Sequence, residues 1–147
     1  MIPPFNDSGC LPEGIYDCTM EEAASRFGVF HSSDRRPQLW AKFIEFMREL
    51  TICDFIEAVL IDGSFVTATP EPNDIDLVVI AASSHDFSAD LPPTAYSLLA
   101  HHRVRSQFGF DIVVVQNGSE NFKQAAAFFQ QIKQRPGMKK GILRIQL

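Results

Sequence analysis

The stretch DGSFVTATPEPNDIDL, residues 62–77, decides how the middle of this chain folds. It follows a short apolar run rich in strand formers, residues 55–61, which is typical of a buried strand. Its last residues open a second run of this kind, IDLVVIAA, which begins at Ile75. The stretch therefore joins two predicted strands, with a Gly-Ser pair after the first and Asp-Ile-Asp at the start of the second.

Around this stretch the sequence predicts an α/β (α+β) fold, in which helices flank a mixed β-sheet. A third strand-like run, FDIVVVQ, begins at Phe110. Apolar residues at helical spacing and capping residues, among them a Thr19 and Glu22 capping box, predict the helices. These helices are expected within residues 19–28, 33–53, 94–109 and 119–135, and a final short strand within 136–147.

Length and composition indicate one globular domain over residues 1–147, with an irregular leader over 1–18 that is rich in Pro, Gly, Asn and Asp. Apolar residues make up 46% of the chain and charged residues 21%, a globular balance. No apolar run approaches the roughly 20 residues that span a bilayer, and the N-terminus has no signal-peptide pattern. We therefore expect a cytoplasmic protein that does not bind a membrane.

Charge and cysteine usage argue against several functions. The net charge is −5 without a dense Lys/Arg stripe, so binding to duplex nucleic acid is not expected. The three cysteines are odd in number and none are spaced C-x-x-C, so neither a disulfide framework nor a zinc site is predicted.

G-x-G-x-x-G and P-loop motifs are missing, and no Ser/His/Asp nucleophile set is apparent.

Three carboxylates mark a candidate site. Asp74 and Asp76 are two residues apart at the start of a strand, so their side chains project from the same face. Asp111 lies one residue into the next apolar strand, and its carboxylate can join them if the two strands are neighbours. Such oxygen clusters suit Mg²⁺ or Mn²⁺ together with substrate phosphates. Gly63 lets the backbone approach a phosphate closely, and the Ser64 hydroxyl can donate a hydrogen bond to it.

A plainer interpretation stays open at this point. Asp-Gly between apolar runs is a strong hairpin signal, so residues 59–68 could form a two-stranded hairpin with a type I′ turn. The acidic residues would then lie in solvated turns. Against this, Asp74, Asp76 and Asp111 all fall at the entry to apolar strands, where acids are disfavoured.

The core motif resembles that of a known superfamily. The motif resembles the signature of the nucleotidyltransferase superfamily that includes DNA polymerase beta. It consists of Gly63-Ser64, nine intervening residues, and Asp74-Ile75-Asp76 followed by an apolar run. The nearest resemblance is to a small, poorly characterised bacterial nucleotidyltransferase-like family. That family combines an IPPFN and LPEGIY leader with this core and a KKGILRIQL ending, so the resemblance covers nearly the whole chain.

The resemblance implies a minimal nucleotidyltransferase-like fold and a role for each matching residue. Asp74 and Asp76 would bind the metal ion associated with the nucleotide. Asp111 would bind a second metal ion and activate the attacking hydroxyl. Gly63 and Ser64 would hold the β- and γ-phosphates.

The chain departs from the motif just after the Gly-Ser pair. Small bacterial relatives often have an arginine there, whereas this chain has Phe65-Val66-Thr67, so a positive charge for the phosphates is missing. Lys139, Lys140 and Arg144 could supply it if the C-terminal segment folds back over the site; the alternative is that they are solvated. This departure bears on catalysis more than on the fold.

Two histidines and one aromatic residue are further candidates for function. His101 and His102 are adjacent, so on a helix they point about 100° apart and cannot share a ligand. Phe128 could contact a partner protein.

The leading hypothesis is a metal-dependent nucleotidyltransferase that moves a nucleoside monophosphate from ATP or another nucleoside triphosphate to a hydroxyl of a protein, a small molecule or an RNA end. The alternative is a weakly active or inactive module that binds nucleotide or a partner protein. Small relatives occur in toxin-antitoxin or phage-defence pairs, which the resemblance suggests as a setting.

Overall fold

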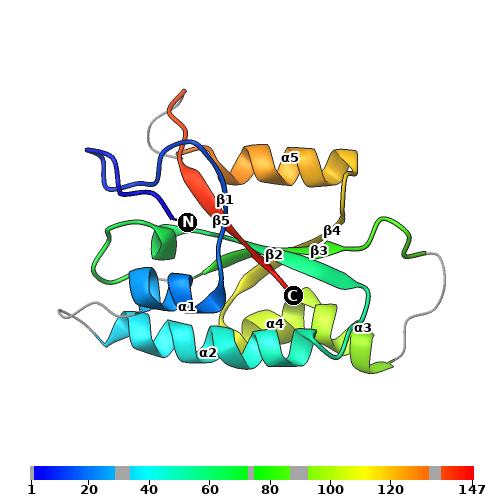
Figure 1. Ribbon diagram of the computed structural model, residues 1–147. Helices are drawn as coiled ribbons and strands as arrows, with labels where there is room; N and C mark the ends of the chain where they lie inside the picture. The colour runs from blue at the N-terminus through cyan, green and yellow to red at the C-terminus, as the bar shows by residue number, and fades with distance from the viewer. Residues whose placement is uncertain (1, 29–33, 73–74, 87–92, 133–136) are drawn as a thin grey trace.

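The computed structural model describes residues 2–28, 34–72, 75–86, 93–132 and 137–147. They form a five-stranded mixed sheet flanked by helices, which confirms the predicted fold class (Figure 1). The strands are β1 (Gly14–Asp17), β2 (Ile56–Asp62), β3 (Asp76–Ala81), β4 (Asp111–Gln116) and β5 (Gly141–Gln146). The α-helices are α1 (Met20–Ala23), α2 (Arg35–Leu50), α3 (Pro93–Leu99), α4 (His101–Phe108) and α5 (Glu120–Phe129). A π-helical turn, η1 (Ala24–Gly28), extends α1, and a 3₁₀ turn, η2 (Ser64–Val66), follows β2.

The strand order is β1-β5-β2-β3-β4. Strand β2 is antiparallel to both of its neighbours, whereas β3 and β4 are parallel and so are β1 and β5. The end of β2 therefore lies beside the starts of β3 and β4. This end of the sheet is on the left of Figure 1, where α5 also ends.

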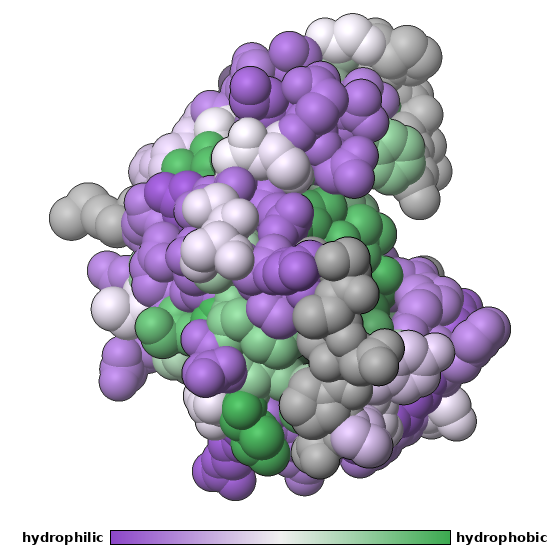
Figure 2. All heavy atoms as spheres, turned by 90° about the vertical axis from the view of Figure 1, so that its right-hand side faces the viewer, coloured by the Kyte–Doolittle hydropathy of each residue, from purple (hydrophilic) through white to green (hydrophobic). Residues whose placement is uncertain are grey.

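Helices cover both faces of the sheet. Figure 1 shows α1, α2, α3 and α4 on one face and α5 alone on the other. Alternation along β3 matches these two layers, because Leu77 and Val79 belong to the larger core cluster with α2 while Val78 and Ile80 belong to a smaller cluster beneath α5. Figure 2 shows the side of the molecule on the right of Figure 1, where hydrophilic residues cover most of the surface and hydrophobic residues form smaller patches.

Several local predictions are confirmed. Thr19 and Glu22 form the capping box of α1, and Gly109 ends α4 with a left-handed backbone (φ 80°). The helix expected within 94–109 is divided, because Ala100 has an extended backbone between α3 and α4. Across the described ranges, none of the helices has the length and apolar character needed to cross a bilayer.

The leader was expected to be irregular throughout residues 1–18, and this is wrong for Gly14–Asp17, which form β1. Strand β1 pairs with β5, at the other end of the chain. The N-terminal segment leaves no room beside Gly141: a Cβ there would lie against the Pro12 carbonyl oxygen, 2.6 Å from the Tyr16 ring and 2.8 Å from Leu11 Cβ. Only glycine fits there, since real side-chain atoms do not approach so closely.

The hairpin alternative for residues 59–68 is also wrong. After Gly63 (φ 91°) the chain enters η2 instead of returning as a strand, and β2 pairs with β3 and β5. The positive φ explains the glycine, because other residues rarely adopt that conformation.

The loop after η2 is held by a buried arginine. Arg36 of α2 is fully buried, and its guanidinium donates hydrogen bonds of 2.6–3.2 Å to the carbonyl oxygens of Phe27, Phe65, Thr67 and Thr69. It also lies over the Phe65 ring at 5.2 Å. Burial lowers the pKa of Arg36 to about 10, so the side chain stays charged at neutral pH.

Replacing Arg36 with Met should therefore lower the free energy of unfolding by about 3 kcal/mol or more, because it leaves buried carbonyl groups without their donors. The control is Arg48→Met at an exposed position of the same helix, which should cost within about 0.5 kcal/mol. Urea unfolding of the three proteins measures both values. Equal losses would contradict a role of Arg36 in holding the loop.

Candidate functional site

A cavity of about 490 Å³ lies where β2 ends, β3 begins and α5 ends. It brings together Gly63, Ser64, Asp76 and Lys140, four residues that the sequence predicts for the site. Its remaining lining residues are Cys10, Asp62, Thr67, Thr69, Phe128, Phe129, Gln131 and Ile132. The cavity thus has a polar part at the strand ends and an apolar part at the end of α5.

Two carboxylates meet at the polar part of the cavity. Asp62 is the last residue of β2 and Asp76 the first of β3, and they are directly paired across the antiparallel strands. Their neighbours Leu60 and Val78 pack in the cluster beneath α5, so by strand alternation both carboxylates project from the same face as that cluster. Directly paired residues have Cβ atoms about 5 Å apart. Asp74, the other acid of the predicted pair, lies outside the described residues.

Asp62 is a site residue that the sequence analysis missed. Its signal was its position immediately before Gly63, at the end of a strand in which every residue from Ala58 onward is buried. An acid there needs a charged partner. Lys140, one residue before β5, provides it: its Nζ lies 2.8 Å from Asp62 Oδ1, with the two side chains only 14% and 7% exposed.

The Gly-Ser turn is fixed by local hydrogen bonds. The amide of Val66 donates to the carbonyl of Gly63, and the Thr67 amide and hydroxyl both donate to the carbonyl of Ser64. The Thr67 and Thr69 hydroxyl oxygens are 2.8 Å apart. In the Phe65-Val66-Thr67 segment, which has no arginine, Phe65 and Val66 are buried and Thr67 lines the cavity.

Asp111 is placed beside Asp76 by the parallel pairing of β4 with β3, as predicted. Its carboxylate, however, forms an ion pair with Arg105 of α4, and His101 Nε2 lies 3.4 Å from the same oxygen. The hydrogen bond from Arg105 holds the pKa of Asp111 below its usual value, although partial burial opposes this. Asp111 is not among the residues that line the cavity.

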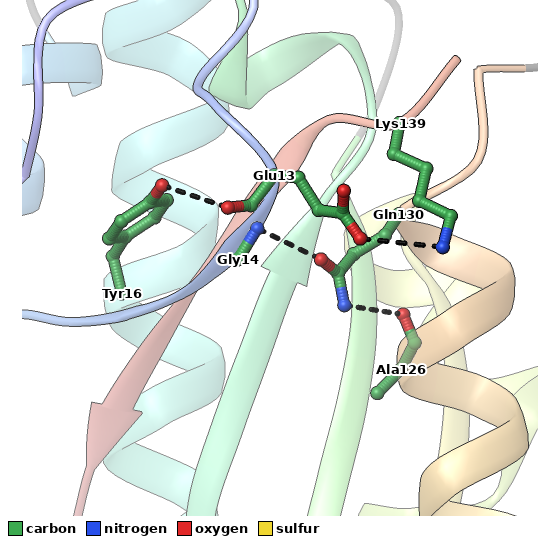
Figure 3. A network of polar contacts seen from close by, with 6 residues as sticks. All are labelled: Glu13, Gly14, Tyr16, Ala126, Gln130 and Lys139. Atoms are coloured by element: carbon green, nitrogen blue, oxygen red, sulfur yellow. Dashed lines mark hydrogen bonds and ion pairs between the residues drawn. The ribbon is translucent and has the colours of Figure 1, made fainter.

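Two of the predicted basic residues lie elsewhere. Lys139 Nζ is 3.3 Å from Glu13 on the surface (Figure 3). Arg144 donates hydrogen bonds of 2.5 and 2.8 Å to the carboxylate of Asp17, which raises the pKa of Arg144 and lowers that of Asp17. Of the three candidates for the missing positive charge, Lys140 alone lines the cavity.

The donor set fits a magnesium-nucleotide complex better than a metal ion alone. Within the described ranges, no group of three or more His, Cys, Asp or Glu side chains is placed to hold a metal ion. Mg²⁺ is commonly bound by one or two carboxylates together with substrate phosphates and water. Asp62 and Asp76 match that smaller requirement.

The contact between Arg105 and Asp111 can be tested directly. Arg105→Gln should raise the pKa of Asp111, because it removes the hydrogen bond that stabilises the charged carboxylate. Since the folded-state pKa is the lower one, the contact stabilises the fold at neutral pH and loses this effect as the pH falls through that pKa. NMR titration of the Asp111 carboxyl measures the shift. Arg103→Gln, which removes a partner of Glu49, is the control and should leave it unchanged; an unchanged pKa in both variants would contradict the assignment.

Comparison with known proteins gives one match. No curated protein and no solved structure matches the chain. A family model described as "Family of unknown function (DUF6932)" matches residues 3–146, almost the full sequence and all of the cavity described above. The chain therefore belongs to the DUF6932 family.

Proposed function

We propose that this protein is a metal-dependent nucleotidyltransferase that moves a nucleoside monophosphate from ATP or another nucleoside triphosphate to a hydroxyl acceptor. One observation carries the proposal: the Gly63-Ser64 turn, Asp76 at the start of β3 and Lys140 before β5 line a single cavity together with Asp62. The resemblance of the core motif, which includes three of these residues, to that of nucleotidyltransferases also supports it. The acceptor would be a protein side chain, a small molecule or an RNA end.

The triphosphate would lie against the Gly-Ser turn. Gly63 has no side chain to keep a phosphate from the backbone, and Ser64 lines the cavity beside it, where its hydroxyl would donate to a phosphate oxygen. Lys140 would supply the positive charge that an arginine after the Gly-Ser pair would otherwise provide. Its ammonium group already lies at the cavity, 2.8 Å from Asp62, so a small side-chain rotation would let it contact phosphate oxygens.

Asp62 and Asp76 would hold Mg²⁺ or Mn²⁺, which when bound offsets the negative charge of the phosphates. In the reaction, the acceptor oxygen forms a bond to the α-phosphorus while the bond from that phosphorus to the bridging oxygen breaks, and pyrophosphate leaves. Asp111 would take the proton of the acceptor hydroxyl. It is beside Asp76 in the sheet, but its carboxylate must first separate from Arg105.

Asp76→Asn should reduce transfer to the level measured without protein, because it removes the first carboxylate of β3 from the cavity. The assay incubates the protein with each α-³²P-labelled nucleoside triphosphate, Mg²⁺ or Mn²⁺, and candidate acceptors. Asp54→Asn, at an exposed position outside the cavity, is the matched control and should retain activity. Equal transfer by wild type and Asp76→Asn would reject the assigned role.

A second function is favoured by the ion pairs of the site. Asp62 is bound by Lys140 and Asp111 by Arg105, so the carboxylates are already balanced by cations of the same chain. A module that binds nucleotide or a partner protein without catalysis would tolerate this arrangement, and the resemblance to members of toxin-antitoxin or phage-defence pairs is compatible with it. Nucleotide binding without transfer by the wild type would select this function.

Nucleotidyl transfer and nucleotide binding without transfer both need a cation for the phosphates, so Lys140→Met should weaken ATP binding about tenfold, the effect of losing one hydrogen bond to a charged group. Titration calorimetry with ATP and Mg²⁺ measures the affinity, with the unfolding transition recorded in parallel because Asp62 loses its partner. Lys139→Met removes the neighbouring, exposed lysine and should have no effect. Similar affinities in the two variants would show that Lys140 does not contact the phosphates.

A further inference from the structure

The end of α5 gives the cavity an aromatic wall. Phe128 and Phe129 line it together with Ile132. Phe129 is anchored, since it packs against the apolar cluster beneath α5, and its ring meets that of Phe128 edge-on at 5.5 Å. Phe128 itself is 57% exposed. The cavity thus presents a large aromatic side chain whose ring is supported on one side and accessible to a ligand on another.

This wall is fixed relative to the polar part of the cavity by Gln130. The side-chain oxygen of Gln130 accepts a hydrogen bond from the Gly14 amide at 3.0 Å, and its side-chain nitrogen donates to the carbonyl of Ala126 (Figure 3). The backbone carbonyl of Gln130 accepts a 2.7 Å hydrogen bond from the amide of Lys140. The hydrogen bonds of Gln130 therefore link the end of α5, which carries the aromatic residues, to the backbone of Lys140.

The charges indicate which end of a ligand each part of the cavity accepts. A helix carries partial negative charge at its C-terminus, and α5 ends at the aromatic wall, so an anion is disfavoured there. The polar part of the cavity, at the strand ends, offers the side chains of Lys140 and Ser64. A ligand with an anionic end and a flat apolar end matches this asymmetry, and the volume of about 490 Å³ is in the usual range for small-molecule sites.

We propose that Phe128 is the base-stacking residue of this cavity: the heteroaromatic base of a nucleotide lies on the Phe128 ring while its phosphates lie at Ser64 and Lys140. This inference rests on the proposed nucleotide site and adds the position and direction of the nucleotide within it. Stacking on an aromatic side chain tolerates any base, since every base has a π-face. Phe128 therefore provides affinity for the base without strong selection among bases.

The test compares ATP with inorganic tripolyphosphate, which has the phosphates but no base. Affinities are measured by titration calorimetry with Mg²⁺ for wild type, Phe128→Ala, Phe128→Tyr and Tyr96→Ala. Phe128→Ala should weaken ATP binding about tenfold or more and leave tripolyphosphate binding unchanged, whereas Phe128→Tyr should bind ATP like wild type. Tyr96→Ala removes another exposed aromatic residue, 68% exposed on α3, and should affect neither ligand.

The outcomes separate this inference from the function on which it rests. If ATP binds to wild type and Phe128→Ala binds it equally well, the base does not lie on Phe128, although the nucleotide site stands. A parallel loss of ATP and tripolyphosphate affinity in Phe128→Ala would also overturn stacking, because it would show a general change of the cavity. If wild type binds neither ligand, the nucleotide site itself is rejected and the base position with it.

Discussion

The buried guanidinium of Arg36 is the interaction on which the site depends. A charge in the core is costly unless polar groups surround it, and here backbone carbonyls of Phe65, Thr67 and Thr69 do so. These carbonyls belong to the connection between β2 and β3, so satisfying the charge also fixes the path of that connection. As a result, the Gly-Ser turn is held at the end of the sheet. The connection between β2 and β3 therefore forms a defined wall of the cavity.

The sheet register places like charges together, and the chain offsets them with its own cations. In the strand register, Asp76 of β3 is the partner of Asp62 on β2 and of Asp111 on β4. Neighbouring carboxylates repel one another most strongly where water is excluded. Lys140 meets the buried Asp62, and Arg105 meets the more exposed Asp111 at the edge of the sheet. These two ion pairs reduce the electrostatic cost of placing the carboxylates close together.

The parts of this structure that the sequence predicts are those with a local signal. Strands β2, β3 and β4 are continuous apolar runs, and Gly63, Ser64 and Asp76 lie at their ends, so their convergence follows once the strands are neighbours. Strand β1 has no such signal, because Gly14–Asp17 form a strand only through pairing with β5. The ion-pair partner of a charged residue also lies far away in the sequence and has no local signal. Lys139 and Lys140 are adjacent before β5, yet Lys139 pairs with Glu13 and Lys140 with Asp62.

The ion pair between Asp62 and Lys140 has a consequence for any ligand of the proposed site. A free metal ion would have to displace the ammonium from Asp62, and a free phosphate would have to draw the same ammonium away from a buried carboxylate, so each alone leaves one charge unbalanced. In the proposed site a metal-nucleotide complex would avoid this cost, because Asp62 would hold the metal ion while Lys140 contacts the phosphates, so that every charge would keep a partner. The pair would therefore favour binding of the two components together over binding of either one, and the apolar wall at Phe128 would add affinity to which neither charge contributes.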